Sequence, residues 1–135
     1  MTIQLSTTLR NARLDQIETT VGTLPVIKIR TGAQPANCAA ADSGTVLVSY
    51  TLASDWAAAA SGGSKSLSST PIAGVGLAAG SAAHYRFYAS DGTTCHMQGT
   101  VTATGGGGDV TIDNVVIAVS QVVNITGWTI TDGNP

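Results

Sequence analysis

Hydrophobic and polar residues alternate along most of the chain after residue 23, and such alternation indicates β-strands with one buried face. The pattern predicts strands over residues 24–31, 45–52, 83–89, 93–103, 110–113 and 121–131. The last segment changes phase between Ile125 and Trp128, and a β-bulge at Thr126 and Gly127 would restore the alternation. Many short strands separated by turn residues predict an antiparallel β-sandwich or jelly roll.

Three stretches between these strands lack the alternation. Residues 32–44 are rich in breakers and predict a long loop. Residues 54–63 predict a single helical turn, with Ser54 as its N-cap and glycines closing it. Residues 66–82 contain Pro71 and several glycines, which predicts an irregular edge segment.

The first 22 residues have a helical pattern instead. Leu14, Ile17 and Val21 recur at a spacing of three and then four residues, which forms one narrow apolar stripe. Thr7 or Thr8 can cap this helix, and Gly22 ends it. The chain therefore divides into an N-terminal arm or helix over residues 1–22 and a β-sandwich domain over residues 23–135. The segment either lies on the sandwich as a helix or docks on a neighbouring subunit as an arm.

Two of the predicted strands form a hairpin. A three-residue loop over residues 90–92 sets Phe87 opposite Cys95, which keeps apolar residues on one face and places Gly92 at the left-handed position of the loop. Cys95 and His96 then point to opposite faces and cannot act together as nucleophile and base. The pattern predicts a small buried thiol and a surface imidazole.

Other candidate chemistry around the hairpin is also weak. In this register Arg86 lies opposite His96 and between His84 and His96, where its charge repels a cation, so no metal site is expected. The glycines at 105–108 lack the Lys-Ser/Thr of a phosphate-binding loop and predict a flexible turn. Cys38 and Cys95 admit one disulfide, but the sequence does not place them within reach of each other.

Composition narrows the classes of function. Only 10% of the residues are charged and the formal charge is −2, with no basic patch, so nucleic-acid binding is not expected. The longest aliphatic run, VVIAV, is too short to span a membrane. The opening residues MTIQLSTTLRN show no secretory signal, so synthesis in the cytoplasm is expected. Asp109 and Asp113 share a strand face about 13 Å apart, too far for a carboxylate pair, and an enzyme is not expected.

Four blocks of the sequence resemble short structural proteins of tailed bacteriophages and prophages. They are MTIQLSTTLRNARLDQIETTVGT, IRTGAQPANCAAADSGTVL, SDGTTCHMQGTVTATGGGGDVTID and GWTITDGN. The resemblance extends over nearly the whole chain and implies a virion structural component. It brings no catalytic residues and no cofactor.

The compact β-fold, the low charge count and the N-terminal arm favour a capsid decoration (cement) protein on the outer head shell, made in the host cytoplasm. Its expected partners are the major capsid protein and sister copies in a homo-oligomer, without nucleic acid or membrane. The alternative is a tail- or neck-associated β-module, with or without a receptor-binding role. We expect the N-terminal segment to contact another subunit more than its own sandwich. The residues expected at this contact are Ile3, Leu5, Leu9, Arg10, Arg13, Leu14, Ile17 and Val21.

Overall fold

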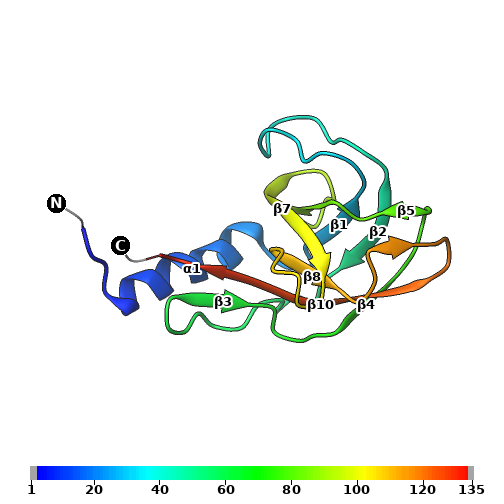
Figure 1. Cartoon of the computed structure of the whole chain (residues 1–135). Coiled ribbons are helices and arrows are strands. Elements are labelled where there is room, and N and C mark those ends of the chain that lie inside the picture. Colours follow the sequence, from blue (N-terminus) through cyan, green and yellow to red (C-terminus); the bar gives the residue numbers. More distant parts are fainter. Residues whose placement is uncertain (1–2, 134–135) are drawn as a thin grey trace.

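The protein is mainly β, with one N-terminal helix, an eight-stranded curled sheet and a separate two-stranded sheet (Figure 1). The computed structural model describes residues 3–133, so residues 1, 2, 134 and 135 of the predicted arm and domain lie outside it. The elements are α1 (Thr7–Val21), β1 (Val26–Arg30), β2 (Val46–Thr51), β3 (Ser64–Ser66), β4 (Ile72–Val75), β5 (Gly80–Ser81), β6 (His84–Tyr88), β7 (Cys95–Ala103), β8 (Val110–Ile112), β9 (Val116–Ile117) and β10 (Val122–Thr131).

The strands do not form the two stacked sheets of the predicted sandwich or jelly roll. The main sheet has the order β2-β1-β6-β7-β8-β10-β3, and β4 also pairs with β10, while β5 and β9 pair only with each other. This sheet curls, and its inner face carries most of the core. The mainly β prediction is confirmed, and the finer architecture differs because one sheet closes most of the core by curling.

One strand pair is parallel, although the pattern predicted antiparallel pairing. β7 and β8 run side by side in the same direction, with Val101 beside Val110. The glycine run between them makes this possible, since a Cβ at Gly106 or Gly108 would lie 2.7–2.9 Å from the Thr102 side chain. The Thr102 hydroxyl also accepts a hydrogen bond from the Gly108 backbone N–H. Close packing on Thr102 therefore excludes side chains at Gly106 and Gly108, while Gly105 and Gly107 have open space and positive φ values of 84° and 80°.

Aromatic side chains fill the centre of the core. The rings of Trp56, Phe87 and Trp128 contact one another, with centroids 4.8–5.9 Å apart. The polar atoms of the buried aromatics have partners: the Trp56 indole donates to the Gly22 carbonyl, and the Trp128 indole donates to the Tyr85 hydroxyl. The β-bulge predicted near Gly127 is present, since the register of β10 against β8 shifts between Ile125 and Gly127.

Residues 54–63 do not form the predicted helical turn. They run back along residues 64–68, with a bridge between Ala57 and Leu67 and a hydrogen bond from the Ser68 N–H to the Trp56 carbonyl. The reason is the burial of Trp56, which is 2% exposed and lies against the other core aromatics. Tertiary burial of this one side chain overrides the weak local preference for a helical turn.

The hairpin between β6 and β7 keeps Tyr85, Phe87 and Met97 on the predicted inner face, but neither the predicted register nor the predicted face of Cys95. Phe87 lies opposite Met97 instead of Cys95, and Tyr88 lies opposite Cys95. A bulge in β7 takes up His96, and the loop spans residues 90–93, closed by the Asp91 carboxylate. Gly92 has a positive φ of 67°, as predicted. An added loop residue and a bulge thus keep Phe87 and Met97 on the inner face, while Cys95 moves to the outer face beside Tyr88.

α1 packs against its own sheet. It begins after Ser6, whose hydroxyl accepts a hydrogen bond from the Leu9 N–H, one position earlier than the predicted cap. Leu14 and Val21 are buried beneath it. Lys65 of β3 contacts the helix from the sheet, and its side chain is 0% exposed. Its ammonium group forms ion pairs with Asp15 at 2.8 Å and with Glu18 at 2.9 Å.

The buried ammonium of Lys65 predicts a strong dependence of stability on the two helix carboxylates. Changing Asp15→Asn and Glu18→Gln together should lower the free energy of unfolding by roughly 3 kcal/mol, because the buried cation then loses both negative charges and keeps only neutral acceptors such as the Ala58 carbonyl. The change Lys65→Met should cost less, since it removes the charge and keeps the apolar stem. Urea unfolding of the three proteins would measure this, and a larger loss for Lys65→Met would contradict it.

Candidate functional site

The predicted contact residues divide between two sides of the N-terminal segment. Leu14 and Val21 are buried and Ile17 is half-buried against the core, so these three side chains pack within the chain. The Arg10 guanidinium is also engaged within the chain, because its Nε donates a hydrogen bond to the Asp132 carbonyl at 2.7 Å. These four residues fix the helix to the sheet and leave the outer side for any partner.

The outer side of the segment carries the other predicted residues. Ile3 is 75% exposed and Leu9 is 49% exposed, while Leu5 is half-buried. The Arg13 side chain is 58% exposed and forms an ion pair with Asp132 at 3.3 Å. In Figure 1 this segment extends beyond the sheet, at the end where both chain termini lie. It offers two apolar groups and one cation at one tip of the molecule.

A second exposed apolar surface lies at the opposite end, around the β5–β9 pair (Figure 1). Val75 and Val122 are cross-strand partners there, and all members are more than half exposed. We call this surface the valine patch, and its members are Val75, Leu77, Val116, Val119 and Val122. Sequence reasoning missed it, although the absence of charged residues between positions 66 and 85 and between 114 and 131 was a usable signal.

Open hollows flank α1. A hollow of about 610 Å³ has an acidic lining that includes Asp15, Glu18 and Asp55. A smaller groove of about 270 Å³ runs between the helix and the sheet, where Ile17 and Met97 line it together with His96. The first two carboxylates are already engaged by Lys65, so the larger hollow is part of the helix attachment.

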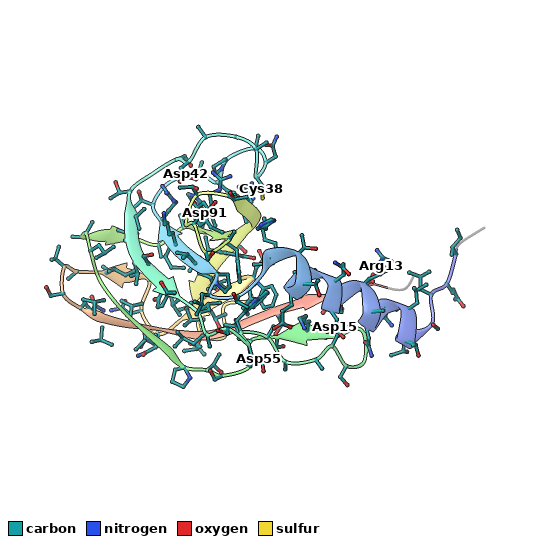
Figure 2. The ribbon with its side chains drawn as sticks, turned by 180° about the vertical axis from the view of Figure 1, so that it is seen from behind. Arg13, Asp15, Cys38, Asp42, Asp55 and Asp91 are labelled. Carbon is teal, nitrogen blue, oxygen red and sulfur yellow. The ribbon has the colours of Figure 1, made fainter. Side chains whose placement is uncertain are left out.

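The most elaborate polar arrangement lies under the loop of residues 32–44, on the face of β1 and β6 that the alternation predicted to be exposed. Arg30 and Arg86 are 6% and 1% exposed. Asp42 binds both, through Oδ2 to Arg30 and through Oδ1 to Arg86, and its Oδ1 also accepts from the Tyr88 hydroxyl at 2.8 Å. Figure 2 shows Asp42 and Cys38 in this loop, above the sheet.

Backbone carbonyls of the loop complete the arrangement. Arg86 donates to the carbonyls of Cys38 at 2.7 Å and Ala40 at 3.0 Å, and Arg30 donates to those of Ser43 and Gly44. The predicted polar face is thus covered because the loop supplies acceptors for two guanidinium groups. We call Arg30, Asp42, Arg86 and Tyr88 the loop clasp.

Electrostatics in the loop clasp follow from burial and pairing. Burial alone would raise the pKa of Asp42, but the Tyr88 hydroxyl and the two guanidinium groups outweigh it and the net pKa is lowered. Burial, followed by the hydrogen bond to Asp42, raises the pKa of Tyr88 to about 12. Burial also lowers the pKa of His84, whose Nδ1 lies 2.9 Å from the Gly32 carbonyl.

The two histidines are not neighbours. His84 lies opposite Thr100, four positions along β7 from His96, and Arg86 lies opposite Gln98, so the predicted pairing of Arg86 with His96 is wrong. His96 is half-buried beside the helix groove instead of lying on an open surface. Within residues 3–133 no group of three or more His, Cys, Asp or Glu side chains is arranged to hold a metal ion.

The bulge also turns Cys95 away from its predicted inward position. It is half-buried, and its sulfur accepts from the Arg86 Nε at 3.3 Å, on the side of the loop clasp. Cys38 in the loop is half-buried as well. The prediction of a buried thiol on the core face is therefore wrong, and the two cysteines lie on the same side of the sheet.

The two aspartates considered for catalysis each have a local structural role. Asp109 accepts from the backbone N–H and the hydroxyl of Thr100 at 2.8 and 2.9 Å. Asp113 accepts from the backbone and side-chain amides of Asn124. Each carboxylate ties two segments of the sheet together.

Comparison with known protein families, curated proteins and solved structures finds no match for this chain. Among the described residues no helix has the length and apolar character that crossing a membrane requires. The class that the structure defines is a mainly β protein with an attached N-terminal helix.

The loop clasp predicts a pH dependence of stability. The lowered pKa of Asp42 means that its contribution is complete above the ordinary value of 3.8 and is lost as the pH falls through the folded-state pKa. The change Asp42→Asn should cost roughly 2 kcal/mol at pH 7, because the carboxylate is partly exposed and solvent moderates the loss.

The measurement is the melting temperature (Tm) from pH 7 down to pH 2. The difference between Asp42→Asn and the unmodified protein should begin to shrink below about pH 4, where the unfolded chain protonates Asp42, and should vanish only below the lowered pKa of the folded state. Asp55→Asn, at an exposed position, serves as the control with no expected change. A difference that stays constant over the whole range would contradict the assignment.

Proposed function

We propose that the protein is a non-enzymatic structural protein of a bacteriophage particle, a decoration (cement) protein bound to the outer head shell. The observation that carries the proposal is the tip formed by Ile3, Leu9 and Arg13, which presents two exposed apolar side chains together with a largely exposed cation at one end of the molecule. The resemblance of four sequence blocks to phage structural proteins supports the same assignment.

The physical basis of binding would be burial of this tip against a neighbouring subunit. Burying an exposed aliphatic side chain stabilises a contact by about 1.5–3 kcal/mol. Arg13 at the rim would set orientation, since rim charges act on encounter and register more than on affinity. The partner is the major capsid protein or a sister copy, and many weak contacts across a shell add up through multivalency.

The tip is better tested by point changes than by removing residues 1–22. Truncation would also remove Leu14, Val21 and the partners of the buried Lys65 ammonium, so it would destabilise the sheet. The double change Ile3→Ser and Leu9→Ser alters exposed positions only, and the Tm should move little.

The experiment introduces these changes into the phage that encodes the chain and counts copies per purified particle by quantitative mass spectrometry, relative to the major capsid protein. The unmodified protein should be present in hundreds of copies. Ile3→Ser with Leu9→Ser should reduce occupancy at least tenfold, since a loss of about 1.4 kcal/mol is already a factor of ten.

The matched control is Val75→Ser with Leu77→Ser, in the valine patch at the other end. If only this control lowers occupancy, the tip is not the binding surface. A dozen or fewer copies of the unmodified protein would place it in the tail or neck, and its absence from particles would reject a virion role.

A further inference from the structure

Cys38 and Cys95 are far apart in the sequence but meet on one side of the sheet. Cys38 lies in the loop of residues 32–44, and Cys95 begins β7. They are the only cysteines in the chain. Both side chains are half-buried, and both are free thiols. Their position therefore depends on the tertiary fold, and specifically on how the loop is held down.

One guanidinium group holds both cysteines. The Nε of Arg86 donates to the Cys95 sulfur at 3.3 Å, and its Nη2 donates to the Cys38 carbonyl at 2.7 Å. Arg86 itself is 1% exposed and is fixed further by Asp42 and by the Ala40 carbonyl. Two residues bound to adjacent nitrogens of one rigid, buried group are held close together.

The surroundings of the Cys38 thiol include the Cys95 thiol. Burial, followed by the interaction with the Cys95 thiol, raises the pKa of Cys38, and Arg86 acts in the opposite direction. Gln98 anchors the loop on the other side of Cys38 by donating to the Pro35 carbonyl at 2.7 Å. The loop is thus tied down on both sides of Cys38, and the guanidinium group that binds the Cys38 carbonyl also binds the Cys95 sulfur.

We infer that Cys38 and Cys95 form an intramolecular disulfide site, open in a reducing compartment and closed in an oxidising one. The co-reactant is a small-molecule disulfide such as oxidised glutathione. One protein thiolate attacks this disulfide, which forms a mixed disulfide and releases one glutathione thiolate. The second protein thiolate attacks the mixed disulfide at the protein sulfur and releases the second glutathione. The protein loses two electrons and two protons, and glutathione gains them.

Closure would lock the loop over the two buried arginines. The bond joins the loop to the middle of the sheet across a long stretch of chain, and long closed loops restrict the unfolded state most. Oxidation should therefore raise the Tm, by an amount on the order of 10 °C for a domain of this size. The inference rests on the loop contacts alone and does not depend on the proposed virion role.

The test uses the full-length protein, reduced and then incubated with a glutathione redox buffer of increasing oxidised fraction. Intact mass should show the loss of two hydrogen atoms without dimer formation, and a digest without reductant should link the peptides of Cys38 and Cys95. The Tm should rise with the oxidised fraction. Free thiols in excess oxidised glutathione, glutathione adducts alone, disulfide-linked dimers or an unchanged Tm would each overturn the inference.

Two matched variants control for other effects of the oxidant. Cys38→Ser and Cys95→Ser each leave one thiol, so neither can close the bond, and the Tm of each should not rise with oxidised glutathione. A rise equal to that of the unmodified protein would show that the effect has another origin. Because the main readout is made on the unmodified chain, poor folding of one variant does not remove the test.

Discussion

The structure depends on how the basic side chains of two neighbouring central strands, β1 and β6, are paired and covered. β1 and β6 pair so that Lys28 lies opposite Arg86 and Arg30 lies opposite His84, which places four basic groups on one face. Three of them are nearly or fully buried. Burying cations without partners is costly, so this face requires an acid and many acceptors close by. Asp42 and the carbonyls of residues 32–44 supply them, and the path of that loop follows from this requirement.

The opposite face of the same strands is apolar, so it needs to be covered but needs no polar partners. Ile27, Ile29 and Phe87 point into the core, where the curl of the sheet, Trp56 and the helix close over them. A single sheet can do this because β8 is short and joins β7 in parallel, which draws β10 across the core. The helix is then held by apolar contacts from Leu14 and Val21 and by the buried ammonium of Lys65.

Sequence reasoning predicted those features that local pattern determines. The alternation of side chains or backbone preference accounts for six of the strands, the bulge before Trp128, the end of the helix at Gly22 and the left-handed Gly92. The short strands β3, β4, β5 and β9 were not predicted. The alternation also assigned the inward positions of Tyr85, Phe87 and Met97 correctly, although the register differed and Cys95 was placed on the wrong face. Keeping apolar side chains such as Phe87 and Met97 in the core contributes more to stability than a particular loop length. A bulge in β7 therefore accommodates the longer loop.

What the pattern could not predict are contacts made by residues distant in sequence. Polar residues that alternate with apolar ones normally face water, and here a loop covers them because Asp42 matches Arg30 and Arg86. The predicted helical turn at residues 54–63 does not form because Trp56 is buried in the core. Lys65 is buried because two helix carboxylates pair with its ammonium group. The exposed tip residues Ile3 and Leu9 were named from sequence, while the valine patch was missed.

The attachment of Asp132 to Arg10 and Arg13 has a mechanical consequence. α1 leads away from the chain end at which β10 arrives, so the first and last described elements lie side by side with their ends at one tip (Figure 1). A force that pulled those two ends apart would load these contacts one after another, as in unzipping, and would meet little resistance. A force carried from the same tip to the far end of the sheet would instead load the long β10 strand and its neighbours together. The molecule is therefore built to resist tension along its length better than separation of its ends.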